Sequence, residues 1–198
     1  MNYSPFTVVF ILISTLSFFV VSQAQNKRVI VVIQTEMGSI EAEIDTLRAP
    51  ITAKNFLRYV DARHYDGGRF HRTVRMDNQP ANKVKIEVVQ AGVDPNKEKA
   101  GFTPIKLERT TQTGLHHEDG TLSMARDGPD TATSDFFICI GPQPSLDYEG
   151  KRNPDGQGFA AFGRVVKGMD IVRKVQASTA QEQKLTPPIK ILTIRRKF

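Results

Sequence analysis

The 198-residue chain is 39% hydrophobic and 24% charged, which excludes an intrinsically disordered protein and is typical of one globular domain with a sizeable core. Its formal net charge of +6 would suit an acidic partner such as nucleic acid, but the basic residues are scattered along the chain. Only Arg195, Arg196 and Lys197 form a tight cluster, and a short basic run at a terminus is typical of a solvated chain end. We therefore expect no nucleic-acid binding.

The first 24 residues carry no charged side chain and are largely apolar. Their apolar stretches are too short, and too often interrupted by Ser and Thr, for a comfortable membrane span. Ser22 and Ala24 offer small side chains at the positions that signal peptidase reads, which predicts cleavage before Gln25. We interpret residues 1–24 as a signal peptide and residues 25–198 as the domain of an exported protein, periplasmic or secreted, without stable membrane insertion. The alternative is an uncleaved anchor, because no Lys or Arg precedes the apolar stretch.

The first elements of the domain are a hairpin and a helix. Residues 29–35 form an apolar, β-branched run, and residues 40–44 alternate apolar with acidic side chains. This pattern predicts a β-hairpin with one solvated face. Pro50 suits the first turn of a helix, and the apolar residues that follow recur at helical spacing. An amphipathic helix is therefore expected over residues 50–62, packed on the hairpin sheet.

The rest of the chain alternates short strand-like runs with polar or Gly/Pro-containing loops, and a second helix is expected after Gly168. Many strands, two helices and no βαβ alternation predict a mostly β fold with an antiparallel sheet. A closed barrel is favoured because closure removes exposed sheet edges. The expected strands cover residues 70–74, 84–90, 121–125, 136–140, 159–166 and 189–194.

Residues for the common kinds of catalysis are not arranged in familiar patterns. The four histidines, His64, His71, His116 and His117, show no metal-binding spacing, so no metal is expected. There is no G-x-S-x-G elbow and no phosphate-binding loop, although spacing alone leaves a Ser-His-Asp arrangement open. The single cysteine, Cys139, lies in an apolar run, which predicts a buried and inert thiol.

The chain contains an ordered set of motifs: FHR at 70–72, VQAG at 89–92, LSMA at 122–125, SDFFI at 134–138 and FAAFG at 159–163. Together these motifs resemble the cyclophilin family over the chain from about residue 29 to the C-terminus. The resemblance implies a closed eight-stranded antiparallel β-barrel capped by two α-helices, peptidyl-prolyl cis/trans isomerase activity and no cofactor.

The resemblance also implies the residues of the site. Arg72 matches the catalytic arginine of the family. An X-Pro bond rotates slowly, over a barrier of roughly 18–20 kcal/mol, because the nitrogen lone pair is delocalised into the carbonyl. A guanidinium that donates a hydrogen bond to this nitrogen binds the twisted transition state more tightly than the planar ground state. The implied substrate-binding residues are Phe70, Gln90, Ala125, Arg126, Phe137, Leu146 and Phe159, with Phe136 pointing into the barrel instead. His71 is expected to be a buried structural residue, because this reaction moves no proton.

The chain departs from the family pattern at the groove. An insertion over residues 75–84 stands where a short turn normally carries a pocket phenylalanine, so that the aligned residue is Glu87 or is lost. Asp135 replaces a glutamine, and Ser145 replaces a common tryptophan, which predicts weak cyclosporin binding. Phe159 replaces a common histidine and keeps its wall of the pocket apolar.

Two functional hypotheses follow. The first is an active isomerase, expected to be a monomer, that acts on proline-containing segments of unfolded or flexible exported proteins and assists their folding. The second is a catalytically weak, proline-directed binding module or chaperone, suggested by the insertion and by Asp135.

Overall fold

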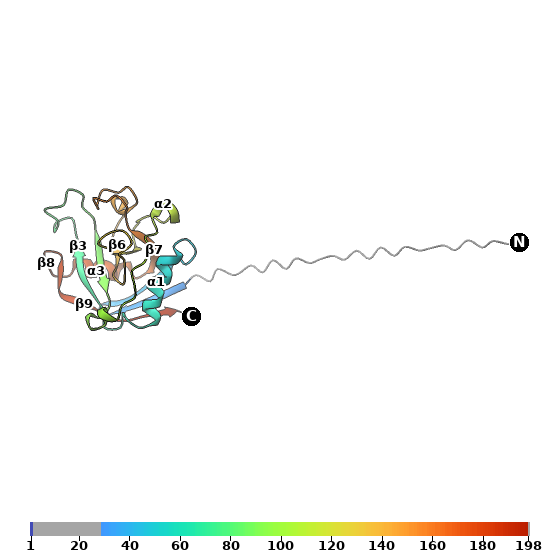
Figure 1. Ribbon diagram of the computed structural model, residues 1–198. Coiled ribbons are helices and arrows are strands. Elements are labelled where there is room, and N and C mark those ends of the chain that lie inside the picture. The colour runs from blue at the N-terminus through green and yellow to red at the C-terminus, as the bar shows by residue number, and fades with distance from the viewer. Residues whose placement is uncertain (2–28, 198) are drawn as a thin grey trace.

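The computed structural model describes Met1 and residues 29–197, and within these residues a closed antiparallel β-barrel carries the fold (Figure 1). The strand order is β1-β2-β7-β5-β6-β4-β3-β9, and the barrel closes because β1 also pairs with β9. The two-residue strand β8 pairs only with the start of β9. The expected eight-stranded barrel is confirmed. The predicted signal peptide lies outside the described residues.

The strands follow the expected runs with a few changes at their ends. The hairpin forms as predicted, with Val29 opposite Ile44 and Thr35 opposite Gly38. The strands are β1 Val29–Thr35, β2 Gly38–Ile44, β3 Arg69–Val74, β4 Val88–Gly92, β5 Thr121–Met124, β6 Phe136–Cys139, β7 Ala160–Lys167, β8 Ala180–Gln181 and β9 Lys184–Lys197.

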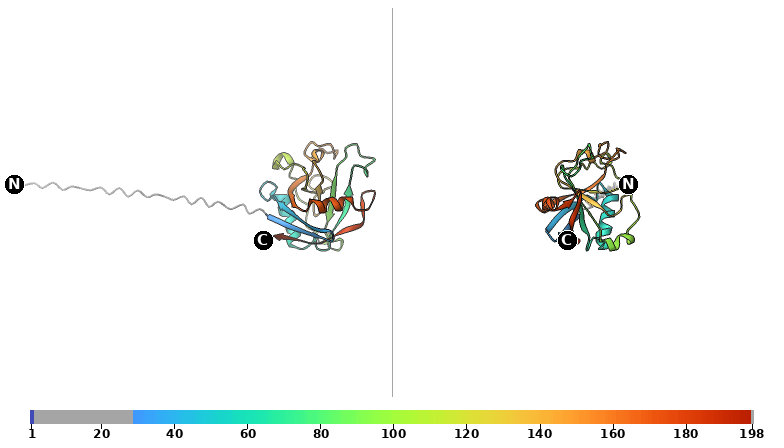
Figure 2. Two further views of the ribbon diagram at one scale, coloured as in Figure 1. Left: turned by 180° about the vertical axis from the view of Figure 1, so that it is seen from behind. Right: turned by 90° about the vertical axis from the view of Figure 1, so that its left-hand side faces the viewer.

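Two main helices pack on the barrel, on opposite sides of it (Figure 2). They are α1 Pro50–Asp61 and α3 Met169–Ala177, and both were expected. Glu108 caps the start of α1, where its carboxylate accepts hydrogen bonds from the backbone N–H groups of Ile51 and Thr52, which would otherwise be unsatisfied. Shorter helical turns are η1 Pro95–Ala100, α2 Thr110–Thr113 and η2 Pro144–Leu146.

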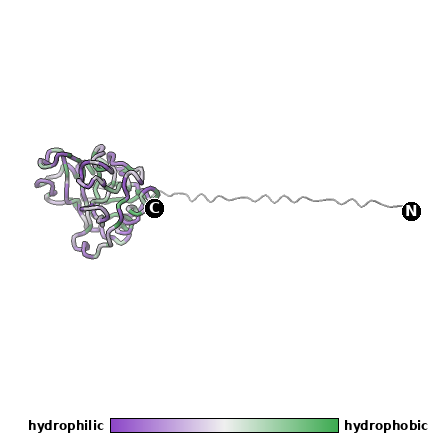
Figure 3. Tube along the Cα trace, turned by 45° about the horizontal axis from the view of Figure 1, so that its top comes forward, coloured by the Kyte–Doolittle hydropathy of each residue, from purple (hydrophilic) through white to green (hydrophobic). Residues whose placement is uncertain are grey.

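The interior of the barrel is aromatic. The ring of Phe56, on α1, lies 5.3 Å from that of Phe136 and 5.1 Å from that of Phe162, distances typical of favourable aromatic pairs. All three side chains are fully buried. Hydrophilic residues dominate the outlying loops of the chain (Figure 3).

A second, smaller apolar cluster lies on the outside of the barrel. It contains Val74, Ile86, Val88, Phe137, Cys139 and Leu146. Phe136 belongs to the interior cluster and Phe137 to the outer one, as the alternation of side chains along a strand predicts. The outer cluster shapes the candidate site.

Two predictions about the ends of strands were wrong. Strand β4 begins at Val88 and not at residue 84, because the backbone of Ile86 bonds to the side chain of Gln79 instead of a neighbouring strand. The last strand, expected over residues 189–194, runs on through the basic cluster at the C-terminus, whose side chains stay partly exposed. The three side chains of this cluster form ion pairs, Arg195 with Asp66, Arg196 with Asp61 and Lys197 with Glu41.

Among the residues that the structure covers, no helix is long and apolar enough to cross a membrane.

Candidate active site

A row of side chains crosses four neighbouring strands on the outside of the barrel. Arg72 on β3 pairs with Gln90 on β4, Gln90 pairs with Phe137 on β6, and Phe137 pairs with Ser123 on β5. Directly paired residues in an antiparallel sheet have side chains on the same face. Register alone therefore brings a cation, an amide and an aromatic ring side by side.

A β-bulge places the arginine in this row. The pairing of β3 with both β4 and β9 shifts between Phe70 and Arg72. Simple alternation would turn Arg72 inward like Phe70, but a bulge inserts one residue and re-aims the next side chain. As a result His71 and Arg72 both face outward, and both are half-buried.

The Arg72 guanidinium is held by two glutamine side chains. Its Nε and Nη2 donate to Oε1 of Gln183, at 2.9 and 2.6 Å, and its Nη1 donates to Oε1 of Gln90 at 3.0 Å. A guanidinium has five N–H donors, so one N–H on Nη1 and one on Nη2 are left for a substrate. Burial lowers the pKa of Arg72, but an arginine keeps its charge in proteins.

A groove of about 390 Å³ opens beside this guanidinium. It brings together Arg72 and six of the seven residues predicted to bind substrate: Gln90, Ala125, Arg126, Phe137, Leu146 and Phe159.

The prediction for Phe70 was wrong. Its side chain is fully buried in the interior cluster, where its ring lies 6.4 Å from that of Phe136. It lies before the bulge, so it points inward and cannot touch a substrate on the outer face. Phe70 supports the barrel beneath Arg72.

Aromatic and aliphatic side chains form the floor and one end of the groove. The ring of Phe137 packs edge-on against that of Phe159, with centroids 5.3 Å apart and an interplanar angle of 88°. Leu146 is buried beside them in the same cluster. The result is an apolar slot next to a fixed cation.

Ile86, two residues after the insertion, forms a further wall that the sequence did not identify. Ile86 lines the groove and is 6% exposed, packed in the outer cluster. The aligned Glu87 does not form this wall, because its carboxylate accepts a hydrogen bond from Gln176 on α3. Gln79, itself buried, fixes Ile86 by donating to its carbonyl at 2.8 Å. An isoleucine thus lines the groove, and the residue aligned with the family's phenylalanine does not.

Ala125 and Arg126 also line the groove. The Arg126 guanidinium donates to the carbonyl of Gly158 and pairs with Asp155 at 2.7 Å, and it lies over the ring of Phe159. With its side chain 1% exposed, Arg126 braces the loop that carries Phe159.

Asp135 lies beside the site and contacts two of its side chains, His71 and Gln90. One carboxylate oxygen lies 3.1 Å from Nε2 of His71 and accepts a hydrogen bond from Nε2 of Gln90. Burial raises the pKa of Asp135, opposed by the hydrogen bond from Gln90 and the charge of His71. Burial lowers the pKa of His71. His71 is half-buried and not fully buried as expected, and no hydrogen bond joins Asp135 to Arg72.

A buried histidine lies behind the floor of the groove and was also missed. The ring of His117 stacks at 6.0 Å on Phe137, its Nδ1 lies 2.6 Å from Asp147 and its Nε2 lies 2.9 Å from Oγ of Ser123. This is a Ser-His-Asp arrangement, but Ser123 is fully buried, so no substrate reaches it. The trio is a structural support for Phe137. No cluster of metal-ligating side chains is found among the described residues.

Comparison with known proteins shows the family of the chain. A family described as "Cyclophilin type peptidyl-prolyl cis-trans isomerase/CLD" matches residues 30–196. A peptidyl-prolyl cis-trans isomerase of Acinetobacter baylyi is 38% identical over 169 residues, covering 82% of each chain. Peptidyl-prolyl cis-trans isomerase A of Dickeya dadantii is 37% identical, covering 79% of this chain and 75% of its own.

Solved structures share the fold. The crystal structure of a cyclophilin-type isomerase of Cryptosporidium parvum superposes with a TM-score of 0.69 at 23% identity, covering 86% of this chain and 98% of that one. A second structure of that protein, with a TM-score of 0.69 and 22% identity, was determined in the presence of the dipeptide Ala-Pro.

Proposed function

The chain belongs to the cyclophilin family of peptidyl-prolyl cis-trans isomerases, and we propose that it turns X-Pro bonds in exported polypeptides, with Arg72 as the catalytic residue. One observation supports this proposal most directly: Arg72 and the apolar side chains around Phe137 line the same groove.

The geometry supports rotation about the X-Pro bond. The slot accepts the apolar proline ring and excludes water from one side of the amide. The remaining N–H groups of Arg72 then donate to the prolyl nitrogen as its lone pair localises, an interaction stronger in the twisted state than in the planar one. The Gln90 amide fixes Nη1 and, with the Ala125–Arg126 backbone, offers hydrogen bonds to the peptide.

Exchange spectroscopy on a short Ala-Pro peptide tests the proposal. We expect the protein to accelerate cis/trans exchange and Arg72→Ala to remove the acceleration. Arg48→Ala is a matched control, because Arg48 pairs with Asp45 at the surface and does not line the groove. Peptide binding without acceleration would favour the binding-module alternative, which Asp135 and the insertion motivate. No binding and no acceleration would refute both.

Export is the second part of the proposal and depends on the uncharged apolar residues 1–24. N-terminal sequencing of protein recovered from the cell envelope or medium is expected to begin at Gln25. A mature protein that retains Met1 and stays with membranes would show an anchor instead.

A further inference from the structure

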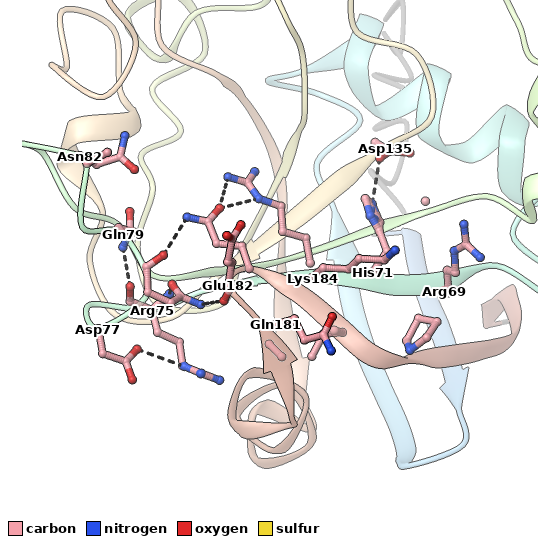
Figure 4. A pocket seen from close by; sticks show the side chains of 18 of the residues that line it. Arg69, His71, Arg75, Asp77, Gln79, Asn82, Asp135, Gln181, Glu182 and Lys184 are labelled. Carbon is pink, nitrogen blue, oxygen red and sulfur yellow. Dashed lines mark hydrogen bonds and ion pairs between the residues drawn. The ribbon is translucent and has the colours of Figure 1, made fainter.

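A second cleft adjoins the groove and is built by the inserted segment. It has a volume of about 1220 Å³ and meets the groove at Arg72 and Asp135, which line both. The inserted residues Asp77, Gln79 and Asn82 lie on one side of it, and His71 and Asp135 point toward each other on the other (Figure 4). Gln181, Glu182 and Lys184, from the β8–β9 hairpin, lie between them (Figure 4).

We propose that Gln183 and the inserted segment around Asn78 form a tether that positions the Arg72 guanidinium for catalysis, an inference that rests on the function proposed above. Gln183 lies in the turn between β8 and β9. Three of its polar atoms bond to the segments that flank the cleft.

The Gln183 side chain has its orientation fixed at both ends. Its oxygen accepts two hydrogen bonds from Arg72, and its nitrogen donates to the backbone carbonyl of Asn78 at 3.1 Å. Since Arg72 can only donate and a carbonyl can only accept, the amide cannot flip without losing all three bonds. The Gln183 backbone carbonyl also accepts from the N–H of Thr73 at 2.8 Å.

Asn78 anchors the inserted segment to this turn. Its Nδ2 donates to the carbonyls of Thr73 and Glu182, at 3.0 and 2.9 Å, and its Oδ1 accepts from the backbone N–H of Arg75 at 2.7 Å. Asn78 therefore ties the insertion to the strand that carries Arg72 and to the turn that carries Gln183.

The tether matters because an arginine side chain is long and has many rotamers. Gln90 holds only Nη1, which leaves the plane of the guanidinium free to swing. Bonds from Nε and Nη2 to a single oxygen fix that plane. The partner is a neutral amide, so the full positive charge stays available for the prolyl nitrogen, whereas a carboxylate in its place would offset it.

The test compares three variants with the wild-type protein in the exchange assay. We expect Gln183→Ala to lower kcat roughly tenfold with KM unchanged, because the tether acts on the transition state and misplacement of a catalytic group is costly. Asn78→Ala is expected to lower kcat in the same direction. Gln181→Ala is the matched control, because this exposed glutamine of the same hairpin makes no side-chain hydrogen bond within the described residues, and it is expected to leave both constants unchanged.

Nuclear magnetic resonance of the Arg72 Nε–H group provides a readout independent of turnover. We expect slow exchange of this proton with water in the wild-type protein and in Gln181→Ala, and fast exchange in Gln183→Ala. A Gln183→Ala protein with wild-type kcat, or with raised KM and unchanged kcat, would overturn the inference, as would a slowly exchanging Nε–H. An inactive wild-type protein would overturn the proposed function, while the exchange of Nε–H would still decide whether the tether exists.

Discussion

Replacing Ile86 by alanine should weaken both the fold and the substrate groove. Ile86 is 6% exposed and packs in the outer cluster with Val88 and Phe137. Truncating a buried isoleucine costs about 2–5 kcal/mol. The lower end, about 2 kcal/mol, is expected because one side of Ile86 borders the open groove, so that water can fill the space left behind. In a domain of this size that corresponds to a Tm lower by roughly 4–8 °C.

The same substitution removes part of the wall that a substrate proline would contact. A loss of about one buried methylene of contact, ~0.8 kcal/mol, predicts a KM roughly fourfold higher. Thermal unfolding and the peptide exchange assay measure the two effects. Met76→Ala is the matched control from the neighbouring insertion, because Met76 is 52% exposed and its truncation should change stability by about 0.5 kcal/mol or less. Equal stability of the two variants would contradict the packing of Ile86 in the outer cluster. An unchanged KM in Ile86→Ala would show that Ile86 is not a wall of the pocket.

Three further outcomes follow from the groove and its supports. Burial raises the pKa of Asp147, but hydrogen bonds from His117 and His116 outweigh it and lower the pKa. The ionised carboxylate therefore stabilises the fold above the unfolded pKa of about 3.9, and this stabilisation is lost as pH falls through the lower folded pKa. Urea unfolding across acid pH should show that loss in the wild type and not in Asp147→Asn, which should be about 1–3 kcal/mol less stable at neutral pH. Burial raises the pKa of Cys139 well above its ordinary value, so iodoacetamide at pH 8 should label it slowly in the native protein and quickly in urea; fast native labelling would contradict its burial. Cyclosporin should bind weakly because Ser145 stands in place of a tryptophan, and a titration that does not rely on fluorescence would measure this. Tight inhibition would refute the prediction.

Local sequence patterns predicted the parts of the fold that depend on local physics. The hairpin of β1 and β2, the helix that begins at Pro50 and the opposite directions of Phe136 and Phe137 each follow from side-chain periodicity. Their evidence lies within a few residues of chain. The sheet pattern already favoured a closed barrel, but its eight strands and most of the groove came from the resemblance, which compares whole ordered motifs.

The wrong assignment of Phe70 and the failure to identify Ile86 and His117 have physical reasons that a local sequence pattern does not reveal. Phe70 was assigned to the groove through the resemblance, in the same motif as Arg72, but the bulge between them sends the two side chains to opposite faces. Ile86 was missed because its backbone is fixed by Gln79, which lies in the insertion. His117 contacts Asp147, 30 residues further along the chain, so its support of the floor appears only in three dimensions.

The structure of the insertion changes how the differences between this chain and the family pattern are interpreted. Read from the sequence alone, the lost pocket phenylalanine and the added segment suggest a damaged groove. In the folded chain the inserted Gln79 fixes Ile86, which forms an aliphatic wall of the groove. The inserted Asn78 is bonded to the turn that contains Gln183, the residue whose side chain binds Arg72. Because one segment contributes to both the apolar slot and the cation, its removal should impair substrate binding and catalysis together, whereas point changes at Ile86 and Gln183 should separate them into a rise in KM and a fall in kcat. That separation is the property that distinguishes a working groove rebuilt by the insertion from a family fold that has kept only its binding surface.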